Sequence, residues 1–193
     1  MLQVRIHGRG GQGVVTAAEM LSIAAVEQGR RAQAFAAPGV ERPGTPGVAF
    51  CLIDDRDIAP RPPVVEPDAV VVLDATLLSQ VDALQGLKPE GYVLINSRRS
   101  FDDLGLGETT WRMRHERLCT VPATEIAIKH LGRPLPGVVL LGGFAALTGL
   151  ITLPAVVHAI GDRFGGPVAA AHVAAATEAY EFVRREIREL ARL

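Results

Sequence analysis

The sequence predicts an α/β fold of the Rossmann-like type, with a mainly parallel sheet flanked by helices and a helical C-terminal segment. Three observations support this prediction. A glycine-rich turn separates a short apolar strand from an apolar helix near the start of the chain. Two uninterrupted apolar runs then follow at residues 69–73 and 92–95, as is typical of buried parallel strands. Beyond Pro136 the pattern is helical almost to the end.

The first part of the chain predicts a strand, a helix, a second strand, a loop and a third strand. The expected ranges, in this order, are 2–6, 14–28, 31–35, 36–47 and 47–53. Strand, glycine turn, helix and strand together form the first half of a nucleotide-binding βαβ unit. The loop is rich in proline and glycine, which exclude helix and central strand and favour a defined path. A turn at 54–56 and a proline-rich segment ending at Pro63 come next.

The rest of the chain alternates strands and helices before it becomes helical. The expected elements are a strand at 69–73, a helix at 77–84, strands at 92–95 and 118–121, and a helix at 124–131. The helical end should pause at Gly161 and at 165–167, and its last helix should begin near Val168. An apolar stripe on that helix should pack on the domain or on a partner; it consists of Val173, Tyr180, Val183 and Ile187. We expect a single domain over residues 1–193.

Composition excludes several classes of function. The chain has 193 residues, of which 48% are hydrophobic and 21% charged, and this indicates a globular protein. The formal net charge is −1, so no basic field indicates nucleic-acid binding. Glycines interrupt the apolar stretch at 138–152, which is shorter than the ~20 residues of a membrane span and predicts a buried helix. With no signal peptide ahead of the first strand, we expect a cytoplasmic protein without nucleic-acid or membrane partners.

The side chains that usually carry metal or catalytic chemistry are scattered. Cys51 and Cys119 stand far apart, which excludes a C-x-x-C zinc or iron–sulfur site and predicts two buried thiols. The five histidines show no metal-ligand spacing, and no Gly-x-Ser-x-Gly elbow is present. We therefore expect neither a metal site nor an autonomous catalytic centre in this chain.

The glycine turn is the strongest functional signal. Gly8, Gly10 and Gly13 have the G-x-G-x-x-G spacing that lets an anion approach the free N–H groups of a helix's first turn. Arg9 can add a phosphate contact, and Gln12 a hydrogen bond to a ligand or a neighbouring subunit. The alternative is that the glycines only permit close packing. Because the second strand does not end in the acidic residue that holds an NAD ribose, a dehydrogenase with its own nicotinamide is disfavoured.

Four other residues have two interpretations each. Asp74 and Asn96 follow predicted strands at the edge where α/β folds bind ligands, but either can instead cap the next segment. His7 lies beside the glycine turn and either contacts a ligand or packs at the strand end. Trp111 stacks on an adenine or fills an interface.

Two motifs resemble a known family. The segment at 7–13, His-Gly-Arg-Gly-Gly-Gln-Gly, with Thr-Ala-Ala-Glu at 16–19, resembles the opening of the gamma subunit of pyruvate:ferredoxin oxidoreductase and its relatives. The segment at 39–46, Gly-Val-Glu-Arg-Pro-Gly-Thr-Pro, is similar to that family's G-x-E-R-R-G-x-P loop, with Pro43 in place of the second arginine. The distance between the motifs also fits, and the resemblance covers nearly the whole chain. An asparagine that often precedes the family's Leu-Gly pair is missing near 137–142.

The resemblance implies a subunit of an assembly that oxidatively decarboxylates a 2-oxoacid, such as pyruvate or an aryl or alkyl analogue, to an acyl-CoA and CO2. It implies that this chain binds coenzyme A (CoA) and presents it to the reaction. Thiamine diphosphate, Mg and [4Fe–4S] clusters are implied in alpha, beta and delta-type partner subunits, with ferredoxin or an NAD-linked subunit as acceptor. The CoA-binding residues that it implies are Gly8, Arg9, Gly10, Gly11, Gln12, Gly13, Val40, Glu41 and Arg42.

Other functions stay open at this level. A non-catalytic scaffold that only holds partner subunits would explain the absence of a catalytic set and the apolar final helix. A free-standing nucleotide-dependent oxidoreductase would use the glycine turn for its own cofactor. The indolepyruvate branch of the family has a similar glycine motif, so the 2-oxoacid is not identified by the sequence.

Overall fold

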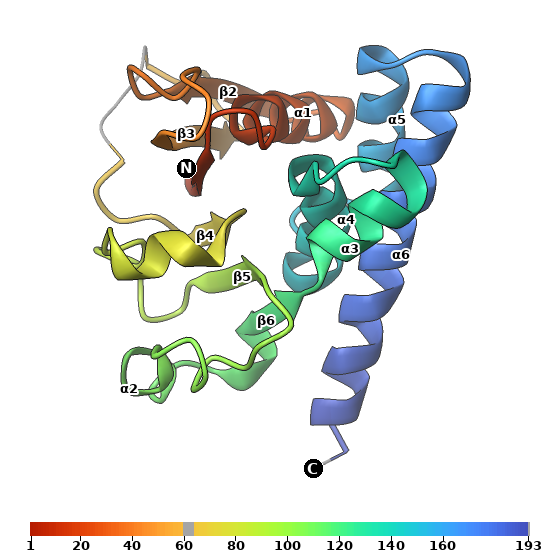
Figure 1. Ribbon diagram of the computed structural model, residues 1–193. Coiled ribbons are helices and arrows are strands. Elements are labelled where there is room, and N and C mark those ends of the chain that lie inside the picture. The colour runs from red at the N-terminus through yellow and green to blue at the C-terminus, as the bar shows by residue number, and fades with distance from the viewer. Residues whose placement is uncertain (60–63, 193) are drawn as a thin grey trace.

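The computed structural model describes residues 1–59 and 64–192, so the proline-rich segment expected up to Pro63 lies largely outside the described residues (Figure 1). Its strands are β1 (Leu2–Arg9), β2 (Arg31–Ala36), β3 (Pro46–Asp54), β4 (Ala69–Val72), β5 (Tyr92–Asn96) and β6 (Leu118–Val121). Its α-helices are α1 (Val14–Glu27), α2 (Gly107–Thr110), α3 (Ala123–Leu131), α4 (Pro136–Thr148), α5 (Leu153–Arg163) and α6 (Gly166–Leu190). Two 3-10 segments, η1 (Ala75–Ser79) and η2 (His115–Arg117), complete the described elements.

The six strands form one mixed sheet in the order β2-β3-β1-β4-β5-β6. Strands β1, β4, β5 and β6 pair in parallel, whereas β3 pairs antiparallel with both β1 and β2. The predicted mainly parallel α/β fold is therefore confirmed. The implied placement of the second strand beside the first was wrong, because β3 lies between them. Burial explains this: four of the nine residues of β3 are buried, three of them in succession, so this strand needs an interior position, whereas no residue of β2 is fully buried.

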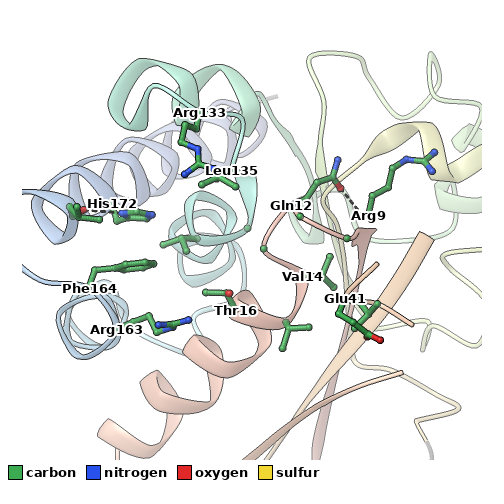
Figure 2. A pocket seen from close by; sticks show the side chains of 18 residues that line it. Arg9, Gln12, Val14, Thr16, Glu41, Arg133, Leu135, Arg163, Phe164 and His172 are labelled. Carbon is green, nitrogen blue, oxygen red and sulfur yellow. Dashed lines mark hydrogen bonds between the residues drawn. The ribbon is translucent and has the colours of Figure 1, made fainter. Parts of the chain in front are cut away.

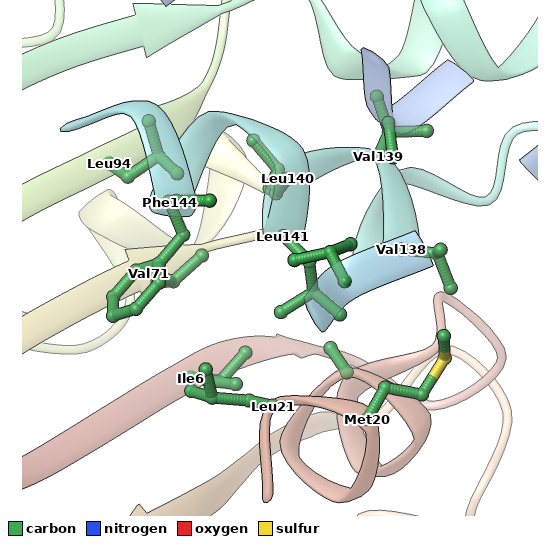
Figure 3. Packing of buried hydrophobic residues seen from close by; sticks show 14 of the residues in the cluster. Ile6, Met20, Leu21, Val71, Leu94, Val138, Val139, Leu140, Leu141 and Phe144 are labelled. Carbon is green, nitrogen blue, oxygen red and sulfur yellow. The ribbon is translucent and has the colours of Figure 1, made fainter. Parts of the chain in front are cut away.

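The long helices pack on one side of this sheet (Figure 1). Helix α4 lies at the centre of that layer and is buried on nearly all sides, as predicted for the apolar stretch at 138–152, but it ends at Thr148, with Gly149 as its C-terminal cap. In the cluster of Figure 3, Phe144 of α4 lies with Val71 and Leu94 of the sheet. On the other side of α4, Leu141 lies toward Met20 of α1. Helix α4 thus contacts both the parallel strands β4 and β5 and helix α1.

The apolar stripe of α6 packs on its own domain, which answers one of the alternatives left by the sequence. Val183 is fully buried, and Val173, Tyr180 and Ile187 are partly buried against the same core. Close approach makes this packing possible, since a Cβ on Gly142 of α4 would collide with the backbone of α6. No helix within the described ranges is long and apolar enough to cross a membrane.

Two expected helix boundaries were wrong. A helix at 77–84 is replaced by η1 (Ala75–Ser79) and a series of turns. The buried Arg5 side chain donates hydrogen bonds to the carbonyls of Ala83 and Gln85, at 3.0 and 2.5 Å, and so holds the end of this segment in its observed turns. Gly161, expected as a pause, lies inside α5, and the chain breaks instead at residues 149–152, where Gly149 has a left-handed backbone (φ 63°).

Candidate functional site

The glycine turn connects the end of β1 to the start of α1. Gly11 and Gly13 have positive φ values of 91° and 86°, which only glycine adopts at low cost. Gly13 is the residue before the first turn of α1, and no side chain caps that helix. The first N–H groups of α1 therefore have no acceptor within the helix and face outward from the turn.

The proline-rich loop at 37–45 lies against this turn. The N–H of Gly10 donates to the carbonyl of Thr45, and the N–H of Gly44 donates to the carbonyl of Gly10, both at 3.0 Å. A Cβ on Gly10 would collide with the carbonyl oxygen of Arg42. Gly10 is therefore required for close packing of two backbone segments, whereas Gly11 has open space around it.

A hydrogen-bond network fixes the two polar side chains of the turn. The side chain of Gln12 accepts from the backbone N–H of Arg9 at 2.7 Å and donates to Asp74 at 2.9 Å. Arg9 also pairs with Asp74, with its Nε 3.0 Å from the carboxylate, and donates to Thr76. The guanidinium of Arg9 consequently points away from the cavity that the turn lines (Figure 2).

Asp74 is the centre of this network. Partial burial raises the pKa of Asp74, but hydrogen bonds from Thr76 and Gln12 and the charge of Arg9 outweigh this effect and leave the pKa below its ordinary value. Its side chain also accepts from the N–H of Thr76 at 2.9 Å and caps η1. The capping interpretation of Asp74 is thus confirmed, and the same carboxylate holds the glycine turn in place.

Asn96 and His7 also have structural roles. The Asn96 side chain accepts from the N–H of Thr124 at 3.1 Å and donates to the carbonyl of Leu73 at 2.8 Å, so it pairs an N–H of the first turn of α3 and links the ends of β4 and β5. His7 packs within the fold rather than in the cavity. Burial and the charge of Arg5 lower the pKa of His7 to about 4.

A cavity of about 440 Å³ opens between the glycine turn and the C-terminal helices (Figure 2). One wall consists of the turn, the first turn of α1 and two residues of the 37–45 loop. The opposite wall comes from the segment before α4, the start of α4, the end of α5 and the start of α6. The lining residues include Gly10, Gly11, Gln12, Gly13, Thr16, Val40, Glu41, Arg133, Leu135, Gly137, Arg163, Phe164, Val168 and His172.

The cavity favours an anion. The first turns of α1, α4 and α6 all contribute to its walls, and helix N-termini carry partial positive charge. Arg133 and Arg163 add two full charges, and no carboxylate of the described residues forms a salt bridge with either. Glu41 is the acidic residue of the lining, and its side chain is exposed.

Most of the residues implied by the resemblance meet at this cavity. Arg9, Gly10, Gly11, Gln12, Gly13, Val40 and Glu41 line it. Gly8 and Arg42 do not. A Cβ on Gly8 would approach Val14 to 2.6 Å, so Gly8 serves the packing of β1 against α1. The sequence does not indicate Arg133, Arg163 and His172 as residues of this site, because they lie far from the turn along the chain and form no local motif with it.

Two aromatic side chains in the far wall of the cavity contact each other. Phe164 stacks on His172 with ring centroids 4.1 Å apart and an interplanar angle of 12°. The Nδ1 of His172 lies 2.9 Å from the carbonyl of Val168, to which it donates. These contacts fix the connection between α5 and α6, at which Arg163 stands.

Comparison with known proteins agrees with this geometry. The family model described as pyruvate ferredoxin/flavodoxin oxidoreductase matches residues 3–182. The chain belongs to this family.

Its relatives are gamma subunits. The Pyrococcus furiosus pyruvate/ketoisovalerate oxidoreductases common subunit gamma is 43% identical over 190 residues, which cover 98% of this chain and 100% of the relative. The pyruvate synthase subunit PorC of Methanothermobacter marburgensis is 43% identical over 94% of this chain and 97% of its own length. This chain is likewise a gamma subunit of a multi-subunit oxidoreductase, as the resemblance implied.

Solved structures extend the likeness to three dimensions. The pyruvate oxidoreductase subunit PORC of Thermotoga maritima has a TM-score of 0.78 and 35% identity, with 93% of this chain and 95% of that chain covered. A 2-oxoglutarate:ferredoxin oxidoreductase from Magnetococcus marinus shares the fold, with a TM-score of 0.71 and 15% identity over 96% of this chain and 31% of that chain. That structure contains 2-oxoglutarate, CoA and succinyl-CoA.

Proposed function

We propose that this gamma subunit binds CoA in the cavity beside the glycine turn and presents it to an assembly that converts a 2-oxoacid to an acyl-CoA and CO2. The observation that carries the proposal is the convergence of uncapped N–H groups and two arginines on one cavity. Its volume of about 440 Å³ lies within the range of about 300–1,000 Å³ that is usual for small-molecule sites. CoA is strongly anionic, so its phosphates match the positive charge of the cavity walls.

The chemistry of this chain is binding and orientation. The amides of Gly13 and the first turn of α1 donate to phosphate oxygens, and the absence of side chains at Gly11 and Gly13 lets the phosphate come close. Each favourable charge at a helix N-terminus contributes about 0.3–1 kcal/mol, and more where it is partly buried. Val40 and Glu41 limit the site from the loop side, and Glu41 and Arg42 orient either CoA or the alpha subunit.

Redox and decarboxylation chemistry belong, in this proposal, to alpha, beta and delta-type partners that hold thiamine diphosphate, Mg and [4Fe–4S] clusters. The two cysteine thiols of this chain do not suit the binding of such a cluster. Burial raises the pKa of the Cys51 thiol, and burial and Glu186 raise the pKa of Cys119 to about 12, so neither thiol is a ready thiolate ligand. We propose ferredoxin or an NAD-linked subunit as the electron acceptor.

Two glycines that flank α1 provide a matched test. Gly13 and Gly29 both have left-handed backbones, with φ values of 86° and 79°, but they lie at opposite ends of the helix. Gly13→Asp places a carboxylate in the cavity and should weaken CoA binding at least about tenfold in calorimetric titration of the full chain. Gly29→Asp, with similar backbone strain, should leave CoA affinity unchanged. Equal CoA affinity in Gly13→Asp and the wild type would overturn the proposal.

The scaffold alternative keeps one observation in its favour, namely that Gly10 is explained by packing alone. If the chain were only a scaffold, Gly13→Asp would leave CoA-dependent turnover of the assembled oxidoreductase intact. Co-purification of the partner subunits with that variant separates the two functions, because a CoA defect in a fully assembled complex cannot come from lost assembly.

A further inference from the structure

The far wall of the cavity holds two arginines that come from different parts of the chain. Arg133 follows α3, and Arg163 is the last residue of α5. Both are exposed, and neither forms a salt bridge with a carboxylate in the part of the chain that the structure describes. In Figure 2 they stand across the cavity from Gln12 and the glycine turn. The site therefore has two separate regions of positive potential.

The two regions suit different anions. The glycine turn offers backbone N–H groups and no side chains, which suits a phosphate diester whose chain continues on both sides. Guanidinium groups suit a terminal phosphate monoester, because their paired donors and full charge match its higher charge and exposed oxygens. A ligand with an internal pyrophosphate and a separate terminal phosphate would use both regions at once.

We propose that Arg133 and Arg163 bind the ribose 3′-phosphate of CoA while the glycine turn binds its pyrophosphate, so that the site selects CoA over 3′-dephospho-CoA. This inference rests on the proposed CoA-binding function and adds the residues that determine specificity. Aromatic contacts hold Arg163 in position: its guanidinium carbon lies 5.8 Å from the ring centre of Phe164, which in turn stacks on His172. Preorganised side chains lose less freedom when a ligand binds.

Titration of the full chain with CoA and with 3′-dephospho-CoA tests this proposal. The wild type should prefer CoA, and Arg163→Gln and Arg133→Gln should each weaken CoA binding about tenfold, the effect of losing one charge-assisted hydrogen bond of about 1.5 kcal/mol. Neither variant should change the affinity for 3′-dephospho-CoA. Arg184→Gln, on the exposed face of α6 and outside the cavity, removes the same charge and should change neither affinity.

The outcomes separate this inference from the proposed function. If the arginine variants lower the affinity for both ligands equally, the arginines do not contact the 3′-phosphate and the inference is wrong. The proposed binding of CoA would not be affected by that result. A wild type that binds both ligands with the same affinity overturns it as well. If the wild type binds neither ligand, the proposed function itself is wrong. Circular dichroism melts of the variants exclude a general loss of folding.

Discussion

The Cα of Gly10 packs directly against the backbone carbonyl of Arg42, with no room for a side chain between them. This contact joins the glycine turn to the proline-rich loop, and the bridge between Gly10 and Pro43 extends it. The two sequence motifs are thus one structural unit. Within it the glycines differ in role: Gly10 serves packing, while Gly11 and Gly13 provide the backbone angles and the open surface of the turn.

Alanine at Gly10 and at Gly11 should therefore have different effects. Gly10→Ala forces two backbones apart and should lower the free energy of unfolding by about 3 kcal/mol, at the upper end of overpacking effects. Gly11→Ala meets only open space and should lose about 1–2 kcal/mol through its positive φ. Urea unfolding of both variants measures the difference, and equal losses would contradict the assigned packing role.

A second pair of glycines tests the helical layer. Gly142→Ala should destabilise the protein by about 1–3 kcal/mol or more, because its Cβ would meet the backbone of α6 at Ala176. Gly161→Ala, inside α5 with free space around it, should instead stabilise the protein by about 0.5–1 kcal/mol through helix propensity. Thermal melting of both variants shows whether each substitution raises or lowers the stability. A stabilising effect at Gly142 would show that α4 and α6 are not in such close contact.

His7 should make stability depend on pH. Burial and the charge of Arg5 lower its pKa to about 4, although contact with the Ala83 backbone and the charge of Asp82 act in the opposite direction. The unfolded chain, with a histidine pKa of about 6.5, therefore binds the proton first as pH falls. The free energy of unfolding should decrease by up to about 3 kcal/mol between about pH 6.5 and pH 4. This decrease should be missing in His7→Gln. Urea unfolding across this pH range, with NMR titration of the His7 ring, provides the measurement.

Asp74 should cause a second loss of stability at a more acidic pH. Its pKa lies below its ordinary value because hydrogen bonds from Thr76 and Gln12 and the Arg9 charge outweigh partial burial. The stabilisation is complete above the unfolded pKa of about 3.9 and should be lost as pH falls through the lower folded pKa. Asp74→Asn keeps a capping side chain but removes the charge, so it should lose about 1 kcal/mol at neutral pH and lack the acidic transition. An unchanged stability profile below pH 4 would refute this role of Asp74.

The local elements were predictable where backbone chemistry alone decides them. Gly11 and Gly13 mark a turn because they adopt angles that other residues avoid, and the apolar runs of β4 and β5 indicate strands buried on both faces. The helix expected at 77–84 could not be corrected from sequence. The turns at its end are held by hydrogen bonds from Arg5 to the carbonyls of Ala83 and Gln85, and this contact between distant parts of the chain exists only after folding.

By itself, the sequence determined the α/β class, the glycine turn and the family resemblance, because these depend on residues that are close together along the chain. Only the tertiary structure placed β3 between β1 and β2, since that choice depends on which strand must be buried on both faces. It also placed Arg133 and Arg163 across the cavity from the turn, through the packing of α4 and α5 beside α1. Residues so far apart meet only because burying the apolar surface of these helices stabilises one arrangement over the others.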